Sequence, residues 1–311
     1  MNGTRWRMTL VGIIWRTLTL FVLSGAAVLD GQVALSAPTP EQPLFSSPED
    51  AMQAVVEAAK ANDRHAFANV FGPETNRLFS GENAIDLEGL VADLAESTHL
   101  RKDGDASYTL LVGKDQWPFP IPIVGQEGRW RFDTAAGLEE ILNRRVGDDE
   151  LSAITTCRAY AVAQWEYFTD GDLDKDGVTE YAQKFVSAPG KRDGLYWETS
   201  EGEKPSPMGK LVAAARAGGA GAPYHGYYFK ILTRQGPHAP GGKYNYIING
   251  NMIAGYALIA YPAQWGHSGV MTFIVNQQGR VYQKNLGPNT ARIARDMTVY
   301  DPNPGWKLVE P

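Results

Sequence analysis

The chain of 311 residues contains little cysteine and histidine, and this scarcity limits the chemistry that it can carry. Its single cysteine, Cys157, allows no disulfide within the chain, and apolar neighbours at helical spacing favour a buried position over a nucleophile. The five histidines, at positions 65, 99, 225, 238 and 267, show no spacing typical of a zinc site. The sequence therefore offers no recognisable catalytic constellation.

Positive charge is also sparse. The chain has 29 Lys and Arg against 35 Asp and Glu, a formal net charge of −6, and no basic run stands out. Nucleic-acid binding depends on clustered Lys and Arg against phosphates, so we expect no nucleic-acid partner. Hydrophobic residues at 43% and charged residues at 21% are typical of a globular protein. The length suits one large domain or two ordinary ones.

The N-terminal stretch has the pattern of an export signal. Three arginines precede the apolar run 17–29, and the small residues Ala34 and Ser36 follow it. We predict a signal peptide over residues 1–36 and a proline-rich linker over 37–45. The protein is then periplasmic or extracellular, with no membrane contact after cleavage. The alternative is an uncleaved membrane anchor, although the run is short for a bilayer span.

The first half of the exported chain predicts an α+β domain over residues 46–147. Ser47 and Pro48 open a helix with acidic residues in its first turn, and two shorter helices follow. Alternating and aromatic segments then predict three strands of a curved antiparallel sheet, at 106–113, 119–125 and 128–134. A connecting helix over 135–147 is expected to end at Gly147.

The second half, residues 148–311, predicts a long helix packed on an antiparallel meander. Helical periodicity runs over 148–168, and two short helices are expected over 180–186 and 208–217. The strands are expected at 227–234, 243–250, 252–262, 269–276 and 280–286. Asn249–Gly250 is a strong hairpin signal, and short turns favour antiparallel pairing. The predicted fold class is α+β.

The stretch "DGDLDKDGVTEY", residues 170–181, spaces aspartates at every second position and then places a glycine. An EF-hand calcium loop needs oxygen ligands at alternate positions and glycine at the sixth. Oxygen ligands alone favour Ca²⁺ over Zn²⁺. The candidate metal ligands are Asp172, Asp174, Asp176, the backbone carbonyl of Val178, and Glu180.

The end of this motif departs from the EF-hand pattern. Gln183 occupies the twelfth position, where the pattern has a bidentate glutamate. Such a loop is expected to bind calcium weakly, at the concentrations found outside cells, with a structural role. The other interpretation is a solvated acidic turn whose aspartates cap the backbone that follows.

Several longer segments resemble one bacterial family. They include "GRWRFDTAAGLEEILNRRVG", "CRAYAVAQWEYF", "YHGYYFKILTRQGPHAPGG" and "GVMTFIVNQQGRVYQKNLGP". This family is catalogued as domain of unknown function 2950, and the resemblance extends from about Phe45 to the end. It implies an exported bacterial protein without an established activity. Residues 148–300 are also similar to the globular half of pseudopilins, which implies a spine helix against an antiparallel sheet.

Two functions follow from these features. The first is a non-enzymatic module of the bacterial envelope, with a structural calcium loop and an envelope protein or glycan as partner. Its exposed aromatic residues would supply the contact surface. The second is a hydrolase-type enzyme with a site in the cleft between the domains, using His225, Asp193 and Glu166.

Overall fold

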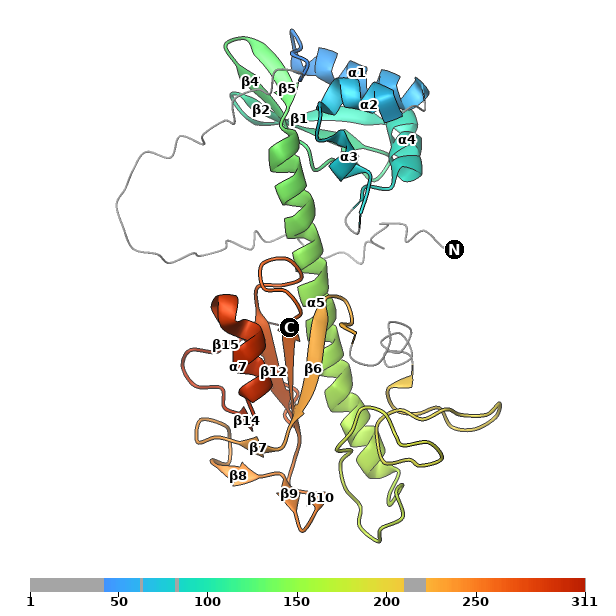
Figure 1. Cartoon of the computed structure of the whole chain (residues 1–311), viewed down its shortest axis with the longest axis vertical. Helices are drawn as coiled ribbons and strands as arrows, with labels where there is room; N and C mark the ends of the chain where they lie inside the picture. Colours follow the sequence, from blue (N-terminus) through green and yellow to red (C-terminus); the bar gives the residue numbers. More distant parts are fainter. Residues whose placement is uncertain (1–41, 62–63, 82–83, 210–221, 311) are drawn as a thin grey trace. The chain divides into compact units, whose positions relative to one another are not determined.

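The computed structural model describes residues 42–61, 64–81, 84–209 and 222–310 (Figure 1). The predicted signal peptide lies outside these residues. The chain divides into two compact units, residues 1–142 and 143–311. The predicted domain boundary, after residue 147, lies within the same helix as this division. None of the helices in the described part of the chain has the length and hydropathy needed to span a bilayer.

Unit 1 packs helices against an antiparallel sheet. Its helices are α1 (Pro48–Ala61), α2 (Arg64–Phe71), α3 (Thr75–Leu78) and α4 (Leu87–Glu96). The strand order is β1-β2-β4-β5, and β3 pairs with β2. The strands are β1 (Thr98–Gly104), β2 (Ser107–Val112), β3 (Trp117–Pro118), β4 (Ile123–Gln126) and β5 (Arg129–Phe132). Side chains from both layers form an aromatic core that includes Phe67, Phe71, Phe119 and Phe132.

The first helix of this unit begins as the sequence predicted. The Ser47 hydroxyl accepts a hydrogen bond from the Asp50 amide at 3.0 Å, as a helix N-cap does. The end of the predicted linker is not only a connector, because Phe45 forms a β-bridge with Trp130. The sequence did not predict β1. Its residues, THLRKDG, are largely polar because the strand is exposed along most of its length.

A single helix, α5 (Thr134–Thr169), replaces the two helices predicted on either side of Gly147. The prediction that Gly147 ends a helix was therefore wrong. Glycine weakens a helix interior by only about 1 kcal/mol. The Arg145 guanidinium and the Asp149 carboxylate lie 3.6 Å apart across this glycine and support the helix there.

Unit 2 has a five-stranded antiparallel sheet in the order β15-β13-β12-β11-β6. Its strands are β6 (Tyr227–Leu232), β11 (Ala257–Pro262), β12 (Thr272–Asn276), β13 (Tyr282–Lys284) and β15 (Lys307–Leu308). Tyr227 lies on the face toward α5, near Cys157. Lys230, on the opposite face, donates to backbone carbonyls of α7 (Thr290–Asp296). The sheet is thus covered by α5 on one face and α7 on the other, which confirms the α+β class.

Smaller strands complete this unit. They are β7 (Arg234–Gln235), β8 (Tyr244–Asn245), β9 (Ile247–Ile248), β10 (Asn251–Met252) and β14 (Val299–Tyr300). β9 and β10 form the hairpin expected at Asn249–Gly250, with both turn residues at positive φ. β14, which the sequence did not predict, pairs with β7 in parallel.

The described residues test only one of the two short helices predicted between α5 and β6. Residues 180–186 contain no helix, because their backbone bonds to other parts of unit 2: the Tyr181 amide donates to the Met252 carbonyl at 2.8 Å. Tertiary contacts here overcome local helix propensity. The helix predicted over 208–217 lies almost entirely outside the described residues.

Candidate metal-binding loop

The candidate metal-binding loop, residues 170–181, begins where α5 ends. The Asp170 amide donates to the Glu166 carbonyl at 3.1 Å, and Gly171 follows with a φ of +91°. A glycine in this conformation is the usual residue just beyond a helix C-terminus. The Asp170 carboxylate forms an ion pair with Lys204. Asp170 is thereby engaged outside the turn at residues 172–178, which we call the aspartate turn.

The aspartate turn is organised around the carboxylate of Asp172. One of its oxygens accepts the Asp176 amide at 3.0 Å, and the other accepts the Gly177 amide at 2.9 Å. Asp176 in turn accepts the amide of Val178 at 2.9 Å. Gly177 has a φ of +92°, so the chain reverses at the residue that the calcium-loop motif reserves for glycine. Each oxygen that accepts one N–H keeps a lone pair for a second partner.

Three carboxylates converge in this turn. Oxygen atoms of Asp172, Asp174 and Asp176 all lie within 4.8 Å of one another. Burial raises the pKa of the Asp174 carboxyl, and the negative charges of Asp176 and Asp172 raise it further. This is a cluster that could hold a metal ion, and its donors are the hard oxygen ligands that Ca²⁺ and Mg²⁺ prefer.

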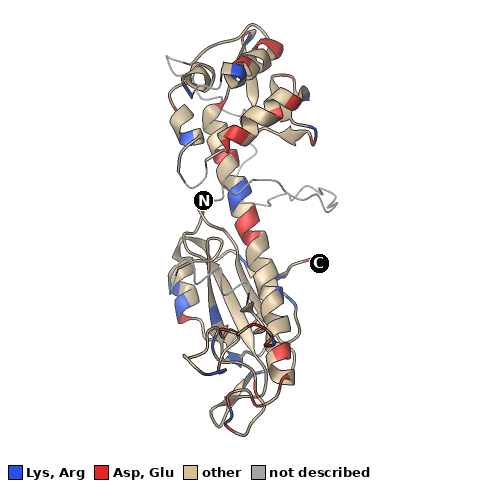
Figure 2. Cartoon of the chain, turned by 90° about the vertical axis from the view of Figure 1, so that its right-hand side faces the viewer, with Lys and Arg blue, Asp and Glu red and all other residues tan. Residues whose placement is uncertain are grey.

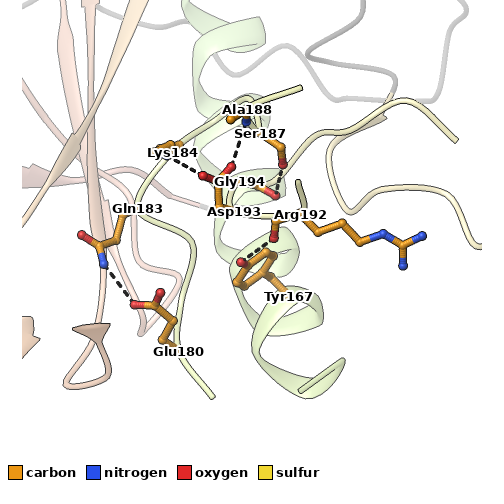
Figure 3. Close-up of polar contacts among 9 residues, drawn as sticks. All are labelled: Tyr167, Glu180, Gln183, Lys184, Ser187, Ala188, Arg192, Asp193 and Gly194. Atoms are coloured by element: carbon orange, nitrogen blue, oxygen red, sulfur yellow. Dashed lines mark hydrogen bonds and ion pairs between the residues drawn. The ribbon is translucent and has the colours of Figure 1, made fainter. Parts of the chain in front are cut away.

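Glu180, the fifth predicted ligand, has a different set of partners. Its side chain is buried, and Oε2 accepts the Met252 amide at 2.5 Å. The same oxygen accepts the Gln183 side-chain amide at 3.0 Å (Figure 3). Burial raises the pKa of its carboxyl, and these hydrogen bonds oppose that shift. Gln183 also donates to the Gly250 carbonyl at 2.7 Å. The structure therefore brings three predicted ligands together, while this oxygen of Glu180 contacts the hairpin.

The loop is anchored at two further points that sequence reasoning missed. Asn251, on β10, donates to Asp176 Oδ2 at 3.0 Å. Gln164, on α5, has no exposed surface and bonds the backbone of Ala182 in both directions, each at 2.8 Å. Nothing in the sequence linked Gln164 to Ala182, because the contact depends on how the loop folds back along the helix.

A second turn, residues 184–197, follows the loop in the chain, is closed by a β-bridge between Val186 and Tyr196, and contains the polar contacts drawn in Figure 3. The Asp193 carboxylate accepts Lys184 Nζ at 2.6 Å and the Ala188 amide at 2.8 Å. The hydrogen bond from Lys184 is the main reason that the pKa of Asp193 lies below its ordinary value. The Tyr167 hydroxyl of α5 donates to the Arg192 carbonyl at 2.8 Å. Asp193 thus holds its own turn closed.

The three residues of the enzyme hypothesis have separate surroundings. His225 is exposed, has a φ of +43°, and its ring lies edge-on against Tyr224. Glu166 is exposed on α5, and Asp193 is engaged with Lys184. Among the described residues, no hydrogen bond or ion pair joins any two of the three. These contacts therefore give no support to the enzyme hypothesis.

The described residues define an α+β protein in which a turn of three clustered aspartates follows a long helix. A family model described as "Protein of unknown function (DUF2950)" matches residues 42–309. The chain belongs to this family, as its sequence segments indicated. No curated protein and no solved structure matches the chain. The similarity to pseudopilins therefore stays a prediction.

Proposed function

We propose that this protein is an exported, non-enzymatic binding module of the bacterial envelope, and that its aspartate turn binds a structural Ca²⁺ ion. The observation that carries the calcium site is the convergence of the Asp172, Asp174 and Asp176 carboxylates within 4.8 Å. Three carboxylates at this separation repel one another, and a divalent cation would remove that repulsion. The backbone carbonyl of Val178 and the Oε1 atom of Glu180 are the further ligands in this proposal.

The site supports a structural role for the ion because its ligands also hold other parts of unit 2. Asp176 contacts Asn251, and Glu180 contacts the backbone of Met252, both on β10. A cation that fixes these two side chains would also fix the loop against the β9–β10 hairpin. Binding to the folded state alone raises the free energy of unfolding by mass action.

Export rests on the N-terminal sequence. The arginines, the apolar run and the small residues up to Ser36 favour cleavage after that residue. N-terminal sequencing of the protein recovered from the periplasm or the medium tests this point. A mature chain that begins at Ala37 supports export and cleavage, and a chain that retains residues 1–36 in the membrane fraction contradicts them.

Calorimetric titration tests the calcium site. Wild-type protein without residues 1–36 is titrated with Ca²⁺ beside the double variant Asp174→Ala, Asp176→Ala. We expect saturable binding with Kd of roughly 0.1 to 1 mM, typical of extracellular modules, and its loss in the variant. The control is Asp105→Ala, Asp115→Ala, which removes the same charge from exposed turns of unit 1. Equal heats from wild type and the Asp174, Asp176 variant would refute the site.

A further inference from the structure

The turn between β9 and β10 exposes an asparagine followed by a glycine. Asn249–Gly250 is the one such pair beyond the predicted signal peptide. Both residues are exposed, with φ of +51° and +95°. The Asn249 side chain makes no hydrogen bond with any described residue. Apart from the chain neighbours of Gly250, no described atom lies within 4 Å of the position that a Cβ there would occupy. The Asn249 side chain therefore has room to turn toward the Gly250 nitrogen.

An Asn–Gly pair in an open turn can lose its side-chain amide without an enzyme. The Gly250 nitrogen attacks the side-chain carbonyl carbon of Asn249 and gives up its proton, the side-chain nitrogen leaves as ammonia, and a succinimide ring forms. Glycine favours this attack because it has no Cβ to shield its nitrogen. Water then opens the ring. Breaking the bond from nitrogen to the side-chain carbon gives aspartate, and breaking the bond to the main-chain carbon gives isoaspartate. Each conversion consumes one water and releases one ammonia.

Ring closure requires the backbone of the turn to move, and the hairpin permits this. The Gly250 amide donates to no acceptor among the described residues. β9 and β10 form a two-stranded sheet of their own, with two residue pairs, apart from the larger sheets of unit 2 (Figure 1). A hairpin of this size is held only weakly by its own pairing. The turn can therefore open locally while the five-stranded sheet stays folded.

The same hairpin holds the segment that follows the aspartate turn. The Gly250 carbonyl accepts the Gln183 side-chain amide at 2.7 Å, and the Met252 carbonyl accepts the Tyr181 amide at 2.8 Å. Isoaspartate at position 249 would lengthen the main chain by one carbon directly before these acceptors. It would also add a carboxylate to a part of unit 2 that already carries acidic residues at the end of α5 and in the loop after it (Figure 2).

We propose that Asn249 is a site of spontaneous deamidation, and that isoaspartate formed there loosens the contacts between the β9–β10 hairpin and residues 181–183. A two-residue hairpin turn depends on left-handed backbone at both of its central residues, and an additional main-chain carbon disrupts that geometry. The inference goes beyond the proposed function and does not depend on the calcium site, because none of the atoms that it uses is a proposed ligand.

Peptide mapping by mass spectrometry, on the exported chain incubated in mildly alkaline buffer, tests the modification. We expect Asn249 to convert to aspartate and isoaspartate, and Asn245 to keep its amide. Asn245 is the internal control because it is also exposed, but the amide that follows it, of Tyr246, is bonded to the Thr233 carbonyl at 2.9 Å. An intact amide at Asn249, after the isolated peptide of residues 244–254 has converted, overturns the proposal.

Hydrogen exchange at single-residue resolution, on the same incubated protein, tests the loosening. The Tyr181 amide should exchange about fivefold faster than in fresh protein, as the loss of one ordinary hydrogen bond implies. Asn249→Gly is the matched control, because glycine suits positive φ and has no side-chain amide to lose. Its exchange should be the same before and after incubation. Equal acceleration in this variant, or unchanged Tyr181 exchange in deamidated wild type, overturns the loosening.

Asn249→Asp separates the two effects of deamidation. This variant introduces the carboxylate without the additional main-chain carbon, so its Tyr181 amide should exchange as in fresh wild type. The same acceleration in this variant as in incubated wild type would assign the effect to charge and overturn the role of isoaspartate.

Discussion

The aspartate turn leads to a prediction in which one substitution has opposite effects with and without calcium. Asp174→Asn keeps the size of the side chain but removes one of three negative charges within 4.8 Å. In water, two unit charges at that distance repel with about 0.9 kcal/mol. Screening at physiological ionic strength leaves roughly half of this for each of two neighbours, or about 1 kcal/mol in total.

Without calcium, this relief should stabilise unit 2, because the wild-type turn then carries its repulsion uncompensated. A gain of about 1 kcal/mol corresponds to roughly 2 to 4 °C in Tm for a unit of this size. With calcium at about ten times its Kd, wild type gains roughly 1.4 kcal/mol from binding, and the variant gains little. The order of the two melting temperatures should therefore reverse between chelator and calcium.

Differential scanning calorimetry in chelator and in calcium measures both effects on the same samples. Asp105→Asn is the control, because Asp105 is fully exposed in a turn of unit 1. Its Tm should change little, and equally, in the two conditions. If Asp174→Asn lowers Tm by the same amount with and without calcium, the aspartates are ordinary caps of the turn, and the reasoning from repulsion is wrong.

Four further predictions concern unit 2. Gln164→Ala should lower the free energy of unfolding by about 2 to 4 kcal/mol in urea denaturation, because it leaves the buried amide and carbonyl of Ala182 without partners; an unchanged midpoint would show that the loop does not depend on this contact. The pKa of Asp174 is raised above its ordinary 3.8, so this carboxyl takes up its proton at a higher pH than an ordinary aspartate does. Because the proton competes with calcium, calcium affinity should begin to fall at that higher pH, as calorimetric titrations at several pH values would show. In calcium-free protein, lower pH should instead favour folding at this group, because the Asp174 carboxyl binds its proton more tightly in the folded state than in the unfolded state. This contribution to the free energy of unfolding is fully present below pH 3.8 and is lost as pH rises through the raised pKa of Asp174. Cys157 is fully buried and its pKa is raised by that burial, so a thiol reagent should modify it only in denaturant, and rapid reaction of the native protein would contradict its position.

The sequence predicted those parts of the fold whose signals are local. The capping of α1 by Ser47, the hairpin turn at Asn249–Gly250 and the turn at Gly177 all depend on nearby residues, and the structure contains each of them. The convergence of three aspartates is also local, because alternate positions around a sharp turn bring their side chains together. Metal identity is not encoded in this way, since the same carboxylates suit more than one cation.

The features that the sequence did not predict depend on contacts between distant segments. The continuation of α5 through Gly147 is the exception, because the ion pair that supports the helix there, Arg145 with Asp149, is local. Residues 180–186 looked helical, but their backbone bonds to Met252 and to Gln164. Such partners lie up to 70 or so positions apart in the chain, beyond the reach of any periodicity or propensity argument.

The anchoring of the loop has a consequence for conformational entropy. Between the end of α5 and Ala182, the aspartate turn is closed at both ends, by the helix on one side and by Gln164 on the other. Ordering a free segment opposes binding by roughly 1 to 2 kcal/mol for each residue fixed. Here that ordering takes place when unit 2 folds, before any ligand arrives. The turn is therefore preorganised, and an ion that binds there would not have to supply that ordering.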